Sequence, residues 1–339
     1  MILLAISELQ AQKFSSKYFY LGEVFDQRLS DKRNIGSVFE FGKSYPVPLN
    51  LLGGEIQYLK NKFDTKLVSK VDPYKVNLGL SHLLFTEKPK SDGLVSGNLR
   101  FEGHFFTQSS EDSTALFPFK YTVSYIRKIG ELQPIHDLLD EKIEDLMKQL
   151  EVWFSKNYAK NYNLARHVIV KTSNFIPKVL EEDTLYFFQR RINFSDFSPK
   201  ASSSGRFAAS IFTNLAYEAN TKMSNDTVII DLATKVYQVK GMSWAIPQAN
   251  NSYALNHEQT HFNITQLIAE KFKERLREEA LPPLDFDSRI QYLYIEYYRK
   301  INQMQDRYDN ETRHGLDKEK QVWWEAYVVE ELKKYNINL

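Results

Sequence analysis

Residues 252–278 read SYALNHEQTHFNITQLIAEKFKERLRE, and this stretch decides how the second half of the chain is interpreted. It contains no glycine or proline, and its apolar residues recur at spacings close to a helical period with charged residues between them. Asn250, Asn251 and Ser252 are candidate N-caps, and Pro282 and Pro283 follow the stretch. The sequence therefore predicts one long amphipathic helix here.

The helix carries the pentapeptide HEQTH at positions 257–261, which fits the pattern H-E-x-x-H. Residues four apart lie on one face of a helix, so His257 and His261 can both reach a single Zn²⁺. The intervening Glu258 can reach a water on the same metal. The pattern therefore predicts a hydrolytic zinc site with Glu258 as its catalytic base. The competing interpretation is a surface helix that carries two histidines by chance.

A zinc site of this kind needs a third protein ligand, because catalytic zinc keeps its fourth position for water. The compact metzincin pattern is not met, since Leu267 stands where that pattern requires a further histidine. Glu278 and Glu279 lie near the distance of a thermolysin-type ligand, but they stand at the charged end of the same helix. The third ligand is therefore expected further along the chain.

The better candidates lie in the run YDNETRHG at 308–315, between two predicted helices. His314 is favoured as the third metal ligand, because neutral imidazole suits zinc. Asp309 and Glu311 remain alternatives, either as the ligand itself or as hydrogen-bond partners of the ligating histidines. Tyr308 is a candidate stabiliser of the oxyanion, although packing is the favoured interpretation because it is the last member of an apolar helix stripe.

The pairing of HEQTHF with the later YDNETRHG run resembles bacterial proteins described as predicted secreted zinc-dependent proteases, a domain of unknown function. The lead-in is similar as well, with NFSDF at 193–197, FAAS at 207–210 and the pair SW at 243–244. Gln321 and Trp324 extend the similarity into the last helix. The resemblance covers roughly residues 183–336, and it implies a zincin-like fold and peptide-bond hydrolysis.

The pattern along the chain predicts an α+β protein. Residues 13–182 are expected to form a mostly-β N-terminal domain with one long helix near 134–154, whose role the sequence does not reveal. Residues 183–339 are expected to form the zincin-like domain, with a β-sheet followed by three helices. These helices are predicted at about 252–278, 287–308 and 317–335.

The first twelve residues, MILLAISELQAQ, are apolar and then polar. They are interpreted as the remnant of a secretory signal peptide, or alternatively as a short buried strand. The first interpretation, together with the resemblance, predicts a secreted protein or one of the periplasm and cell envelope.

Composition limits the classes of function. The 339 residues hold 44 Lys and Arg against 43 Asp and Glu, a balance that gives no support for a nucleic-acid partner. No apolar run is long enough for a transmembrane helix. The absence of cysteine excludes disulfides and thiolate ligands. The expected function is a zinc metallopeptidase acting on a peptide or protein substrate. The alternatives are an amidase using the same site and a catalytically weak zincin-fold scaffold or binding protein of the envelope.

Overall fold

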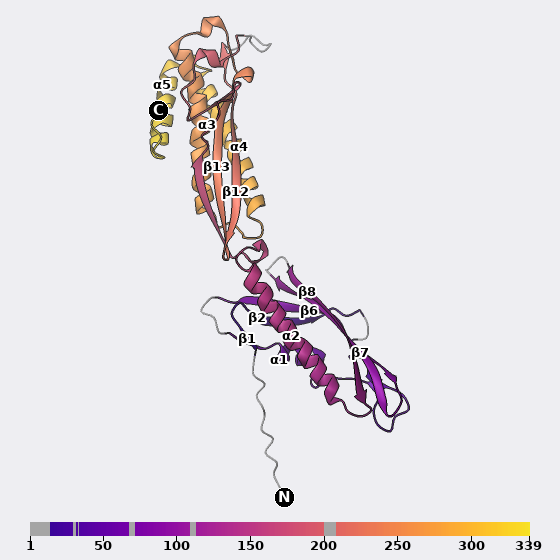
Figure 1. The fold of residues 1–339 in the computed structure, drawn as a ribbon. Coiled ribbons are helices and arrows are strands. Elements are labelled where there is room, and N and C mark those ends of the chain that lie inside the picture. Colours follow the sequence, from indigo (N-terminus) through magenta and orange to yellow (C-terminus); the bar gives the residue numbers. More distant parts are fainter. Residues whose placement is uncertain (1–13, 30–31, 33, 68–71, 109–112, 200–207) are drawn as a thin grey trace. The chain divides into compact units, whose positions relative to one another are not determined.

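The computed structural model describes residues 14–339 except 30–31, 33, 68–71, 109–112 and 200–207. It confirms the α+β class: an N-terminal β-sheet with one long helix is followed by a second sheet and three C-terminal helices (Figure 1). The proposed signal-peptide remnant at 1–12 lies outside the described residues. The chain divides into two compact units after Tyr158.

The first unit is built around a four-stranded sheet in the order β2-β6-β7-β8. Strands β6, β7 and β8 form an antiparallel meander, and β2 runs parallel to β6. The main elements are β2 (Phe19–Asp26), β6 (Tyr74–Pro89), β7 (Leu94–Gln108), β8 (Ser113–Lys128), α1 (Glu55–Lys62) and α2 (Gln133–Asn157). Short pairs complete the unit: β1 (Phe14–Ser16) with β5 (Thr65–Leu67), and β3 (Ser37–Val38) with β4 (Val47–Pro48).

Helix α2 is the long helix that the sequence predicts, and its apolar stripe forms much of the core of the first unit. Proline at its second position fits the first turn, where no intrahelical partner is required of the backbone N–H. The buried side chains recur at threes and fours, as expected for a helix that covers a sheet. They are Ile135, Leu139, Ile143, Leu146, Met147, Leu150 and Phe154.

The second unit begins earlier than the expected boundary at residue 183. Strand β9 (His167–Asn174) pairs in parallel with β13 (Thr227–Val239), so it belongs to the second sheet rather than to the N-terminal domain. Its alternating side chains resemble those of the preceding strands, and the sequence offers no signal for a partner about sixty residues away. The sheet is completed by β10 (Thr184–Tyr186) and β12 (Thr213–Ser224), both antiparallel to β13.

Three helices complete the second unit: α3 (Ser252–Glu278), α4 (Phe286–Thr312) and α5 (Lys318–Lys333). Helix α3 packs against β9, β12 and β13 and also contacts α4 and α5, and Figure 1 shows α3 and α4 running alongside β12 and β13. Strand β11 (Ala209–Ser210), just before β12 in the chain, pairs with β14 (Trp244–Ala245), which lies between β13 and α3. Helix α3 is thus enclosed by other elements, and 17 of its 27 residues are buried.

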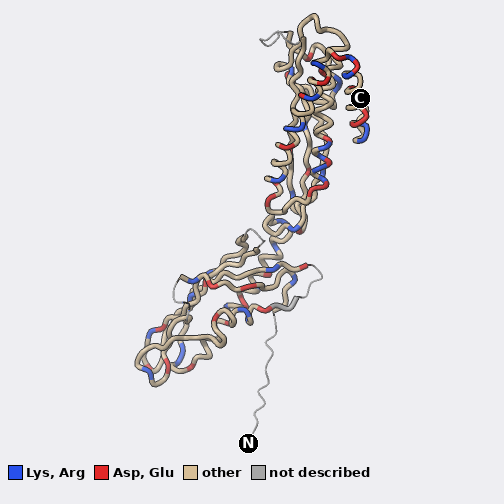
Figure 2. The backbone as a smooth tube through the Cα atoms, turned by 180° about the vertical axis from the view of Figure 1, so that it is seen from behind, with Lys and Arg blue, Asp and Glu red and all other residues tan. Residues whose placement is uncertain are grey.

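Charge and hydropathy are distributed as in an ordinary folded protein. Figure 2 shows basic and acidic residues interspersed along both units. In the described part of the chain, no helix combines the length and the apolar character that crossing a membrane requires.

Candidate metal centre

Helix α3 places the H-E-x-x-H residues inside the second unit. The side chain of Asn251 accepts a hydrogen bond of 3.0 Å from the backbone N–H of Ala254, which caps the start of the helix as the sequence predicts. His257 and His261 follow one and two turns later and are each only 8% exposed. The two imidazoles therefore belong to a buried helix and not to a surface one.

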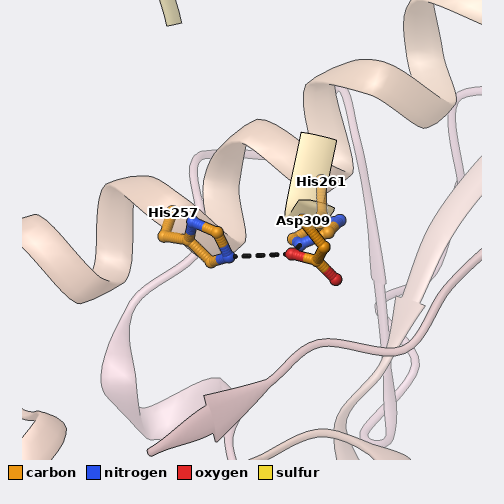
Figure 3. Close-up of side chains that lie close together, drawn as sticks. All are labelled: His257, His261 and Asp309. Carbon is orange, nitrogen blue, oxygen red and sulfur yellow. Dashed lines mark hydrogen bonds and ion pairs between the residues drawn. The ribbon is translucent and has the colours of Figure 1, made fainter. Parts of the chain in front are cut away.

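Asp309 of α4 completes a group of three ligand atoms with these histidines (Figure 3). Its Oδ1 lies 3.2 Å from His257 Nε2 and 3.0 Å from His261 Nε2. All three ligand atoms lie within 4.8 Å of one another. In a tetrahedral zinc site with bonds of about 2.0–2.2 Å, ligand atoms are about 3.3–3.6 Å apart. The observed spacing is close to this, so the group has the geometry to hold a metal ion.

Charge favours the ligating form of Asp309. Burial alone would raise the pKa of its carboxyl, but the hydrogen bonds from His257 and His261 outweigh burial and hold that pKa well below its usual range. Burial likewise opposes a charge on His261, while the hydrogen bond with Asp309 raises the pKa of this imidazole overall. The group therefore presents a carboxylate to two ring nitrogens, which is the protonation state that a metal requires of an acidic ligand.

The ring of His257 is fixed on the side away from Asp309. Its Nδ1 lies 2.9 Å from the hydroxyl of Tyr308 and 3.3 Å from Oε1 of Gln321. The amide nitrogen of Gln321 is already donating to the backbone oxygen of Tyr253 and to Glu325. Its Oε1 is thus an acceptor for a proton on Nδ1, and with this tautomer Nε2 would face a metal ion with its lone pair once the ion replaces the hydrogen bond to Asp309.

Tyr308 is fully buried and contacts the wrong nitrogen for the expected oxyanion role. Its hydroxyl lies on the Nδ1 side of His257, whereas the ligand atom Nε2 faces Asp309. The ring stacks on His257 at 4.7 Å between centroids and packs edge-on against Trp324. Tyr308 therefore packs against His257 on the side opposite to Nε2, which agrees with the packing interpretation.

Glu258 lies beside the group on the same helix and is 5% exposed. Its Oε2 accepts a hydrogen bond of 2.9 Å from the backbone N–H of Ile211, in the segment between β11 and β12. Burial raises the pKa of its carboxyl, although His261 and His257 act in the opposite direction. Helix α3 thus places a buried carboxyl next to the group that could hold a metal.

His314 and Glu311 lie outside the group of three in the described part of the chain. His314, which the sequence favours as the third ligand, has an exposed side chain, and its Nδ1 is 3.6 Å from the other oxygen of Asp309, Oδ2. Glu311 accepts hydrogen bonds from Arg307 and from the indole N–H of Trp324. The structure therefore brings the alternative candidate, Asp309, to the histidines in place of His314 or Glu311.

Sequence reasoning did not find two residues that surround the ligands. Gln305 of α4 and Thr213 of β12 lie near His261 through a cluster of hydrogen bonds with Thr265. Neither position stands in a pattern that predicts a metal site, because the contacts depend on how α4 and β12 pack around α3. Gln321 was identified only as part of the family resemblance.

The chain matches no protein-family model, no curated protein and no solved structure.

Proposed function

We propose that this protein is a zinc-dependent hydrolase, and specifically a metallopeptidase. The observation that carries the proposal is the convergence of His257 Nε2, His261 Nε2 and Asp309 Oδ1 beside the buried carboxyl of Glu258. Two imidazoles and one carboxylate form a donor set that zinc accepts in catalytic sites. The resemblance of the HEQTHF and YDNETRHG segments to predicted zinc-dependent proteases supports the same proposal.

Each residue has a defined part in the proposed reaction. His257, His261 and Asp309 would hold the zinc ion, which would supply a Lewis acid that polarises a carbonyl and lowers the pKa of water. Glu258 accepts a proton from the attacking water and returns it to the leaving nitrogen. Tyr308 and Gln321 hold the ring of His257 so that Nε2 faces the ion. His314 contacts the outer oxygen of Asp309 and orients that carboxylate.

Metal analysis and a cleavage assay test the proposal together. The purified full chain should contain about one zinc per molecule. Iron(II) uses a similar set of two histidines and one carboxylate, so the analysis must quantify both metals. Wild-type protein and Glu258→Gln are then incubated with a peptide library, and new N-termini are counted by mass spectrometry. We expect cleavage by wild type only, with zinc retained in both. A folded protein that binds no zinc would refute the proposal.

A catalytically weak scaffold or binding protein of the envelope is the alternative, and the N-terminal unit motivates it. Residues 14–158 belong to a separate unit with its own sheet and core, and none of the residues described there is a member of the metal group. This alternative predicts that Glu258→Gln leaves the cellular phenotype unchanged. A secreted or envelope location accompanies both proposals, and fractionation of cells expressing the full reading frame tests it.

A further inference from the structure

The imidazole rings of His257 and His261 differ in the hydrogen bonds that their second ring nitrogen, Nδ1, makes. Nδ1 of His257 contacts both Tyr308 and Gln321, whereas Nδ1 of His261 is buried and has no hydrogen-bond partner in the described part of the chain. A buried polar group without a partner destabilises the folded state. Metal-ligating histidines almost always donate this N–H to an acceptor. An acceptor for His261 is therefore expected nearby.

Gln305 is held against the turn of α3 that carries His261. Its amide nitrogen donates to the hydroxyls of Thr265 at 3.0 Å and Thr213 at 3.2 Å. Thr265 in turn donates its own proton to the backbone oxygen of His261 at 3.1 Å, so its hydroxyl oxygen is left to accept. This network assigns the amide orientation of Gln305. With its nitrogen engaged, the polar atom that remains is the side-chain carbonyl oxygen.

Thr265 connects Gln305 to the backbone of His261, because it accepts from the amide of Gln305 and donates to the oxygen of His261. The side-chain carbonyl of Gln305 is therefore a neighbouring acceptor for the buried Nδ1, which has no hydrogen-bond partner in the described part of the chain. A rotation of either side chain is needed to form this hydrogen bond.

We propose that Gln305 is a positioning residue for His261: its side-chain carbonyl accepts the Nδ1 proton and thereby directs Nε2 toward the metal. This inference rests on the proposed function, because it assumes that the ion binds at Nε2. It also gives α4 two contributions to the site, since Gln305 lies one helical turn before the ligand Asp309.

Zinc affinity of three variants tests this inference without any catalytic assay. Gln305→Met keeps the length of the side chain but removes the acceptor, and we expect zinc to bind 10–100-fold more weakly. Gln305→Glu keeps an acceptor oxygen but loses the N–H groups that bind the threonines, and we expect affinity equal to or tighter than wild type. Gln303→Met, at an exposed position of α4, is the matched control and should bind as wild type does. Affinities are measured by competition with a chromophoric zinc chelator.

The outcomes separate this inference from the proposed function. If wild-type protein binds no zinc, both are wrong. If wild type binds zinc and Gln305→Met binds it equally well, only the role of Gln305 is wrong. If Gln305→Glu is as weak as Gln305→Met, the threonine contacts matter and the acceptor does not, which also overturns the inference. Melting curves of the metal-free variants check folding, and Gln305→Leu replaces Gln305→Met if the latter does not fold.

Discussion

Replacement of Asp309 by asparagine should weaken zinc binding by about two to three orders of magnitude. Asparagine keeps the shape of the side chain but removes the charge that faces both Nε2 atoms at 3.0 and 3.2 Å. Structural zinc sites with four ligands bind with about 10–16 kcal/mol, or about 2.5–4 kcal/mol per ligand. Since 1.4 kcal/mol corresponds to a factor of ten, loss of one ligand is expected to weaken binding by about 10²–10³-fold.

Two further variants make this prediction specific to Asp309. His314→Ala removes the partner of the outer carboxylate oxygen, and the loss should stay within about 10–100-fold, as for a residue that orients a ligand. Glu311→Gln, which makes the same charge change two residues later on α4, should bind zinc as wild type does. All affinities come from one competition titration at constant pH. If His314→Ala weakens zinc binding more than Asp309→Asn does, His314 is the third ligand and the assignment of Asp309 is wrong.

Four more outcomes are expected. Glu258→Gln should retain zinc and lose about 10²–10⁴-fold in hydrolysis, measured as initial rates. Removal of zinc with a chelator should lower the melting temperature, by the equivalent of about 2.7 kcal/mol where free zinc was 100-fold above its dissociation constant. Gly315→Ala should cost about 1–2 kcal/mol in denaturant titrations and weaken zinc binding, because Gly315 has a φ of 79° and the new Cβ would lie 3.3 Å from His257 Nδ1. Asp196→Asn should destabilise the protein near neutral pH but much less in acid. Hydrogen bonds from Arg190 outweigh burial and lower the folded-state pKa of Asp196, so its contribution is present above the unfolded pKa and disappears as pH falls through the folded value. The urea midpoints of wild type and variant should converge as pH falls below the unfolded pKa of about 3.9.

Helix periodicity predicted the elements that carry the site, whereas strand boundaries were less accurate. Helix α3 has the predicted bounds 252–278, because its ends carry an Asn cap and a pair of prolines and no residue inside interrupts it. The apolar runs at 228–231 and 236–239 predict two strands, but the structure has one strand, β13 (Thr227–Val239). The segment between the runs, 232–235, keeps the alternation of buried and half-buried side chains that belongs to a single strand.

The third ligand was harder to predict because it depends on where α4 ends. The sequence suggested a loop at 308–315, whose histidine would be free to turn toward the metal. In the structure α4 continues through Thr312, so Asp309 stands on a helical face that packs against α3. His314 follows the end of the helix and is exposed. The chemistry of zinc ligands favoured His314 as the third ligand. The packing of α4 against α3 determines that Asp309 is the side chain that lies beside His257 and His261.

Backbone conformation after α4 gives a physical reason for this arrangement. Arg313, His314 and Gly315 all have positive φ, at 52°, 53° and 79°, and for the two residues with side chains this costs about 1–2 kcal/mol each. The turn is closed by hydrogen bonds from His314 N–H to the oxygen of Asp309 and from Asp317 N–H to the oxygen of Thr312. Such strain persists only where the surroundings determine it, and it is concentrated at functional sites. The strained turn ends α4 just after Asp309 and brings Gly315 against the ring of His257. A substitution of His314 by glycine should therefore stabilise the fold while removing the imidazole beside Asp309. If melting temperature rises and zinc affinity falls in this variant, the strain serves the metal centre; if both rise, the turn is only a helix end.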